Sequence, residues 1–186
     1  MTAARDKARW LSRRMEWLAT ALGAITGMAV LYGLWLLCFD PQRLGRFAIA
    51  QFGEQVGAAA PAALSGLTVL LLAATFVVQA ALLLWALLAL RRAFRQIADD
   101  EVVSVAAARL MRLSGIAFLT STLAMVLLRP LASLILSLDM PAGYRFLAVG
   151  VGTQELMTLL VSGVLIVFGH LITVAAAVDD ENRRFV

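Results

Sequence analysis

Hydrophobic positions along the chain form four long runs separated by shorter polar stretches. The runs place membrane spans at residues 17–39, 67–90, 115–138 and 156–178. Each run is longer than the roughly 20 apolar residues that a helix needs to cross the hydrocarbon core. The pattern therefore predicts an all-α fold, an integral membrane four-helix bundle built from two transmembrane hairpins.

The polar stretches on one side of the spans predict amphipathic helices at the membrane surface. In residues 1–16 basic and apolar groups alternate, which indicates a short helix lying on the inner surface before the first span. In residues 91–114 we expect a helix that breaks at Asp99–Glu101, then a new helix from Val105 with Ser104 as its N-cap. This second helix should continue into the third span, where Pro130 should kink it. Residues 179–186 are left as a C-terminal tail.

Composition agrees with this architecture. The 186 residues are 62% hydrophobic and 15% charged, and their mean hydropathy is +0.88, which is outside the range of soluble domains. We interpret residues 1–186 as a single transmembrane domain.

Basic residues gather on one side of the predicted spans. Of the 16 Lys and Arg, twelve fall in the segments before the first span, between the second and third, and after the fourth. Three fall in the two other connections, and Arg129 lies inside a span. This asymmetry predicts that both termini are cytoplasmic in a bacterial inner membrane. It also favours anionic lipid headgroups over nucleic acid as the partner of the basic clusters.

The two halves resemble each other at an offset of 99 residues. The matched pairs are Asp40/Asp139, Arg46/Arg145, Phe47/Phe146, Gly53/Gly152, Gln55/Gln154 and Arg13/Arg112. An internal duplication would produce this pattern, and so would chance similarity between two loops that meet the same interfacial demands.

Three polar residues fall inside the predicted spans, on three different helices. At about 1.5 Å per residue, Gln79 lies about 18 Å from the outer edge, Arg129 about 14 Å and His170 about 21 Å. Polar groups at such depth either bind a substrate or ion, or hydrogen-bond across the bundle. Both interpretations of this intramembrane polar layer are open.

Acidic runs next to arginine occur at residues 99–101 and 179–181. They suit turns and helix caps that pair with arginine, and they also suit a cytoplasmic docking surface for a protein partner. The candidate docking residues are Arg91, Arg92, Phe94, Glu101, Ser104, Asp180, Glu181, Asn182 and Phe185.

Residues for catalysis are scarce. The chain has one histidine and one cysteine and none of the common hydrolase, metalloprotease or phosphate-loop motifs. We therefore expect no catalytic site, no metal and no cofactor, and we interpret Cys38 as a small buried residue.

Two short stretches resemble a known family. RRAF at Arg91–Phe94, the EVVS turn at Glu101–Ser104 and the DENRRFV ending at Asp180–Val186 are similar to motifs of the bacterial domain of unknown function 2975 family. Its members are small four-span inner-membrane proteins, and many are encoded beside a helix-turn-helix regulator. The resemblance implies this fold and a regulatory role, and it supplies no catalytic residues.

The sequence thus favours a non-catalytic regulatory or accessory membrane protein that acts through a protein partner. A stripe of small residues at Ala19, Gly23 and Gly27 would also suit a homo-oligomer. The alternative is a small transporter or channel built around Gln79, Arg129 and His170.

Overall fold

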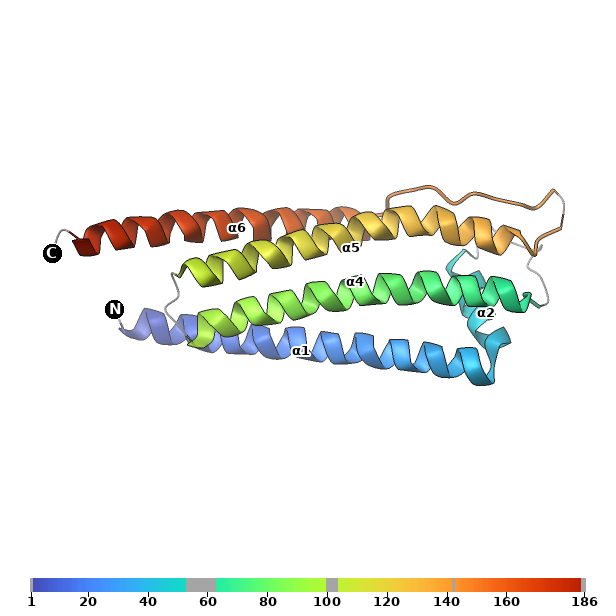
Figure 1. The fold of residues 1–186 in the computed structure, drawn as a ribbon, viewed down its shortest axis with the longest axis horizontal. Helices are drawn as coiled ribbons and strands as arrows, with labels where there is room; N and C mark the ends of the chain where they lie inside the picture. Colours follow the sequence, from blue (N-terminus) through green and yellow to red (C-terminus); the bar gives the residue numbers. More distant parts are fainter. Residues whose placement is uncertain (1, 53–62, 100–103, 142, 185–186) are drawn as a thin grey trace. The chain divides into compact units, whose positions relative to one another are not determined.

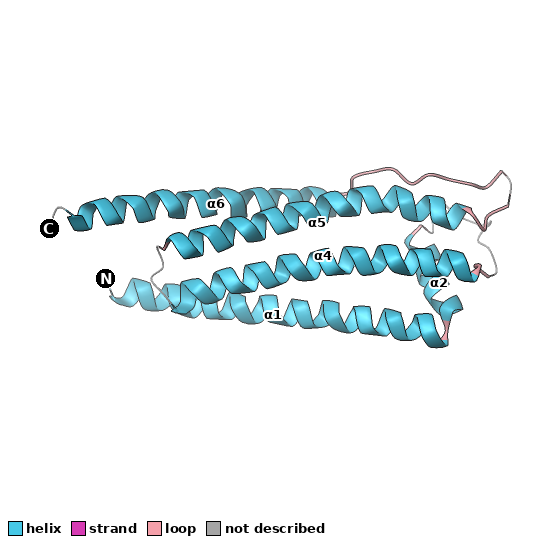
Figure 2. Cartoon of the chain, viewed as in Figure 1, coloured by secondary structure: helices cyan, strands magenta, loops and turns pink. Residues whose placement is uncertain are grey.

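The structure is a computed structural model that describes residues 2–52, 63–99, 104–141 and 143–184, with side chains for residues 10–178 of these. In these ranges all regular secondary structure is helical (Figure 2). The helices are α1 (Thr2–Phe39), α2 (Pro41–Gln51), α4 (Gly66–Asp99), α5 (Val105–Ser137) and α6 (Thr153–Arg184).

Four of the helices, α1, α4, α5 and α6, are long and apolar enough to cross a membrane. Three predicted spans lie within α1, α4 and α6, and the third span ends one residue past α5. The all-α four-helix architecture of a multi-pass membrane protein is confirmed. In its most apolar 18-residue stretch, α1 buries 6% of its residues, whereas α4 and α5 each bury 28%. The side chains of α1 thus face mostly outward.

The helices contribute to two compact units. Unit 1 comprises Met1–Ile25, Leu82–Thr122 and Thr153–Val186, and unit 2 comprises Thr26–Ala81 and Leu123–Gly152. The beginning of α1 and the end of α6 both belong to unit 1 and lie at the same end of it (Figure 1).

Two predicted surface segments are not separate elements. Residues 2–16 continue without a break into the first apolar run as part of α1, and the expected tail from residue 179 continues α6 to Arg184. The sequence has no glycine or proline at either junction, and its Ala, Leu, Arg and Glu residues favour an uninterrupted helix.

The break between α4 and α5 is confirmed. Helix α4 ends at Asp99 and α5 begins at Val105. The hydroxyl of Ser104 accepts a hydrogen bond from the backbone N–H of Ala107 at 3.1 Å, which is the N-cap contact that the sequence predicts. Helix α5 then continues through Pro130 to Ser137. Because proline has no N–H, the carbonyl of Val126 lacks its usual helical partner there.

Small residues form the core of unit 1. Ala86 and Ala89 of α4 cluster with Ala117 of α5, all nearly inaccessible. A second cluster joins Ala93 and Ile97 of α4 with Ala107 and Met111 of α5, and Leu165 of α6 packs against it. Without a hydrophobic drive between helices in lipid, such small side chains allow backbones to approach and gain dispersion energy.

Larger side chains form the core of unit 2. Val69 and Leu72 of α4 cluster with Ile135 and Leu136 of α5, and the half-buried residues Leu44, Ala48 and Ile49 of α2 cover this cluster. Asp40 caps α2 by accepting a hydrogen bond from the N–H of Arg43 at 3.0 Å. The side-chain amide of Gln42 also pairs with the backbone N–H and C=O of Leu64.

The matched outer segments of the two halves differ in conformation. Residues 41–51 form α2, whereas the described residues among their counterparts at 140–150 are not helical. Phe47 is accordingly an exposed helical residue, and Phe146 is half-buried in a loop and contacts the ring of Phe52. An internal duplication, if it shaped the sequence, did not preserve this element.

Candidate functional site

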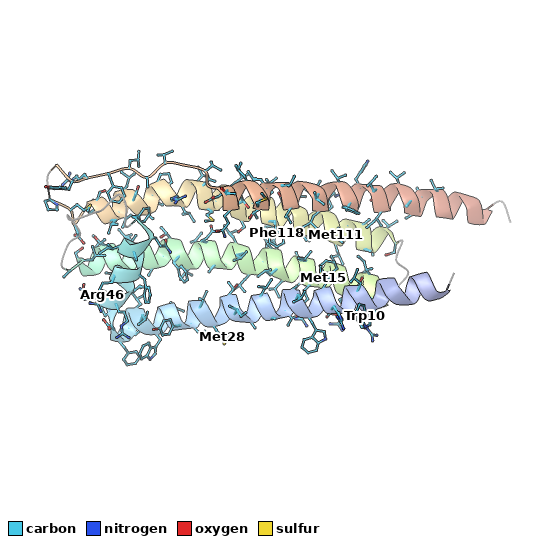
Figure 3. The ribbon with its side chains drawn as sticks, turned by 180° about the vertical axis from the view of Figure 1, so that it is seen from behind. Trp10, Met15, Met28, Arg46, Met111 and Phe118 are labelled. Carbon is cyan, nitrogen blue, oxygen red and sulfur yellow. The ribbon has the colours of Figure 1, made fainter. Side chains whose placement is uncertain are left out.

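Arginines surround one end of unit 1. On α4, Arg91 pairs with Glu16 of α1 at 3.8 Å, and Arg95 pairs with Asp99 at 3.5 Å. On α1, the guanidinium of Arg14 stacks over the ring of Trp10, 3.7 Å from its centroid. Figure 3 labels Trp10 on this helix. Further exposed arginines are Arg13 on α1, Arg92 on α4, and Arg109 and Arg112 on α5. We call these seven arginines the arginine band.

The candidate docking residues on α4 and α5 have mixed roles. Phe94 packs against the Ala93–Met111 cluster, Arg91 is engaged by Glu16, and Ser104 caps α5. These three contacts stabilise the fold of unit 1. Arg92 is exposed and is the one member of this set with a free surface position among the residues that the structure describes.

The side chains of the other candidate docking residues lie outside the described set. Glu101 and Phe185 lie outside the described residues, and Asp180, Glu181 and Asn182 lie on the last turns of α6 with side chains outside the described set. Their role in docking stays a prediction.

Two glycines bring α5 and α6 into close contact. A Cβ atom at Gly115 of α5 would lie 2.8 Å from the backbone oxygen of Ser162 on α6. A Cβ atom at Gly169 of α6 would lie 2.8 Å from the backbone nitrogen of Arg112 on α5. The two helices are therefore antiparallel and nearly in backbone contact over this stretch.

These contacts also determine the register of α6. If the third and fourth predicted spans lay side by side over their full length, Gly115 would be level with Val178, because these residues are the predicted inner ends of the two spans. Instead Gly115 lies against Ser162 and Ile166, which are 12 to 16 residues earlier. At 1.5 Å per residue this shift is about 20 Å. Half of the fourth apolar run thus lies beside the part of α5 that precedes the third span.

The shift leaves apolar side chains exposed beyond the arginine band. Past the contact of Gly169 with Arg112, α6 continues through Leu171, Val174 and Val178, which are 55%, 52% and 52% exposed. Spacings of three and four residues place these side chains on one side of the helix. The result is an uncovered apolar face on unit 1, at the end where its arginines gather.

The structure distributes the predicted polar layer over both units. Gln79 and Arg129 are half-buried in unit 2, and the Oε1 atom of Gln79 is shielded from solvent. His170 is exposed in unit 1, directly after Gly169 and hence beside the α5 turn that ends at Arg112. The mid-span depth of His170 stays a prediction. A shared layer stays a prediction.

A serine pair on α5 holds a segment that the sequence analysis missed. The hydroxyl of Ser137 accepts a hydrogen bond from the N–H of Phe146 and donates one to its C=O, at 3.2 and 2.9 Å. One helical turn earlier, Ser133 accepts a hydrogen bond from the N–H of Ala148 at 2.9 Å. The helix rises about 6 Å over the four residue steps from Ser133 to Ser137, and the two loop steps from Phe146 to Ala148 cover the same length. This is the rise of an extended chain over two residues.

We call residues 144–152 the strap. It runs antiparallel to α5, with Phe146 and Ala148 turned inward and Leu147 and Val149 exposed. Alternating apolar residues were visible in the sequence, but they suit a surface loop equally well. Nothing in the sequence identified Ser133 and Ser137 as its partners.

An aspartate from the end of α5 caps α4. The N–H of Ser65 donates to the Oδ2 atom of Asp139 at 2.6 Å, and the hydroxyl of Ser65 accepts from the N–H of Thr68. Burial by itself would raise the pKa of Asp139. Hydrogen bonds from the Ser65 backbone and from the Thr68 and Ser65 hydroxyls outweigh it and lower the pKa below its ordinary value.

The remaining reactive residues form no site within the described ranges. Cys38 is exposed, so our expectation of a buried cysteine is wrong. At this position near the end of α1 its thiol faces away from the helix contacts. The described residues contain no cluster of three His, Cys, Asp or Glu side chains that could hold a metal ion.

Comparisons with known proteins leave the family open. No protein-family model, no curated protein and no solved structure matches the chain.

Proposed function

We propose that this chain is a non-catalytic regulatory or accessory membrane protein that acts through a protein partner. The partner would engage the cytoplasmic end of unit 1, in a bacterial inner membrane with both termini inside. Membership of the domain of unknown function 2975 family is part of this proposal, because the described residues of its motifs belong to unit 1.

The proposal rests on the uncovered apolar face of α6. Leu171, Val174 and Val178 extend past the level of Arg112, and arginines favour the membrane–water boundary. Apolar side chains beyond this boundary would contact water unless a protein covered them, which is unfavourable by about 25 cal/mol per Å². Exposed apolar patches of this kind typically mark protein interfaces.

The test is purification of the tagged protein from its own membranes in mild detergent, with identification of what co-purifies. We expect a stoichiometric protein partner that is lost in the variant Leu171→Ala/Val174→Ala. The matched control is Leu160→Ala/Val164→Ala, which changes two exposed apolar residues in the first half of the same helix. Equal retention of the partner by both variants would rule out this face as the docking surface.

A second candidate function is transport, which the shielded amide oxygen of Gln79 and the half-buried Arg129 favour. Buried polar groups in spans commonly mark ion or substrate paths. If the protein transports, Arg129→Ala should abolish function without changing expression or folding. If it docks a partner, Arg129→Ala should mainly lower stability, and partner binding should persist.

A further inference from the structure

One face of the α1–α4 pair in unit 1 has arginines at one end and apolar side chains next to them. This order is complementary to the phosphate and the acyl chain of a phospholipid. The reference point is the ion pair between Glu16 and Arg91, because it shows where the two antiparallel helices meet. The positions of other side chains around each helix follow from the rotation of 100° per residue.

Two arginines flank this ion pair on the same side. Arg13 lies roughly 60° around α1 from Glu16, and Arg92 lies roughly 100° around α4 from Arg91. Since the helices are antiparallel, these opposite rotations turn both side chains toward one face of the pair. Both are exposed, and both lie closer to the chain-terminal end of unit 1 than the ion pair does.

Apolar side chains continue this face away from the arginines. Trp17 of α1 lies roughly 100° from Glu16, and Leu88 and Trp85 of α4 lie roughly 60° and 120° from Arg91 in the same direction. Their exposed fractions are 76%, 45% and 42%. Tryptophan favours the headgroup level of a bilayer, and leucine favours the acyl region.

The charge balance leaves the two arginines available. Among the described residues of this end, Glu16 is engaged by Arg91 and Asp99 by Arg95. The ion pairs within the described residues do not include Arg13 or Arg92. Guanidinium groups bind phosphate oxygens with paired, charge-assisted hydrogen bonds.

We propose that this face binds an anionic phospholipid. The phosphate would contact Arg13 and Arg92, and an acyl chain would lie along Trp17, Leu88 and Trp85. A free phosphate ion would use the arginines and leave the apolar path empty, so the combination specifies a lipid. The site is separate from the partner surface on α6 and does not depend on it.

For the test, the protein is placed in vesicles of phosphatidylcholine and phosphatidylglycerol and purified again. Native mass spectrometry then measures how much of each lipid stays bound. We expect bound phosphatidylglycerol to fall about tenfold in Arg13→Gln/Arg92→Gln, which corresponds to about 1.4 kcal/mol. The control Arg109→Gln/Arg112→Gln removes the same charge from exposed positions on α5 and should retain the lipid.

Fluorescence gives a second measurement that does not depend on charge alone. Brominated phosphatidylglycerol should quench the tryptophan fluorescence of the protein more than brominated phosphatidylcholine does. The variant Trp17→Phe should reduce this difference in quenching. Equal loss of lipid in the two arginine variants, equal retention of both lipids, or retention of inorganic phosphate in place of lipid would each overturn the proposal.

Discussion

Glycines in this chain differ in how close their neighbours are. At Gly169 an added Cβ atom would lie 2.8 and 2.9 Å from backbone atoms of Arg112 and Ala108. Backbone atoms cannot rotate away, so the two helices would have to separate. At Gly23 an added Cβ atom would meet nothing within 4 Å.

We therefore expect Gly169→Ala to destabilise unit 1 by about 1–3 kcal/mol through overpacking. Gly23→Ala should leave stability unchanged or raise it by up to about 1 kcal/mol, since alanine is the better helix former. Unfolding in mixed detergent micelles measures both variants. Equal midpoints for the two would show that the α5–α6 contact is not tight in the membrane.

Asp139 should make the stability of unit 2 depend on pH. Because its pKa is lowered on folding, its contribution is fully present above the ordinary value of 3.8 and is lost as the pH falls through the lowered value. The wild-type protein should thus lose stability on acidification below about pH 4 more steeply than Asp139→Asn. Unfolding followed across this range tests it, and parallel curves would contradict the capping role.

The strap shows how a single helix can position an irregular segment. Unpaired backbone groups are costly near the hydrocarbon core, and Ser133 and Ser137 supply partners for Phe146 and Ala148. Leu147 lies between these two residues and Val149 follows them, and both are exposed. The hydroxyls thus fix which side of the strap faces α5.

Replacing both serines by alanine should release the strap from α5. Each lost hydrogen bond should destabilise the contact by about 1 kcal/mol, and amide exchange at Phe146 and Ala148 should increase. Thr120→Ala is the control, because that hydroxyl bonds the carbonyl of Ile116 in its own helix. Unchanged exchange in the serine variant would mean that side-chain packing alone holds the strap.

At the scale of the whole molecule, four helices among the described residues are long and apolar enough to cross a membrane, and four crossings would return the chain to the side on which it began. The asymmetry of arginine and lysine predicts that this side is the cytoplasm. A reporter that is active only in the cytoplasm should therefore be active when fused after Arg184. A reporter that is active only outside the cytoplasm should be active when fused after Gln51. Cys38, as the single cysteine, should react with a membrane-impermeant maleimide only from outside. The opposite pattern would invert the topology.

Residue patterns determined the four long helices of this protein, whereas helix α2 at Pro41–Gln51 was not predicted. The apolar runs predicted all four long helices, and the Asp99–Ser104 break and its serine cap were recognisable because capping chemistry is local. Residues 2–16 were predicted as a separate surface helix and residues 179–184 as a tail, whereas both continue the neighbouring long helix.

Tertiary packing decided the register of these elements. Hydropathy gives the length of an apolar run and no information on its level relative to a neighbour, so the shift of α6 by about 20 Å depended on Gly115 and Gly169. In this register Gly169 contacts Ala108 and Arg112 of α5, and α6 continues past them with the exposed apolar face that we assign to a partner. The sequence by itself therefore determined what the helices are, because helix formation in lipid is a local property. Only the tertiary structure decided which residues they bring together, because close approach depends on pairs of small side chains distant in the chain.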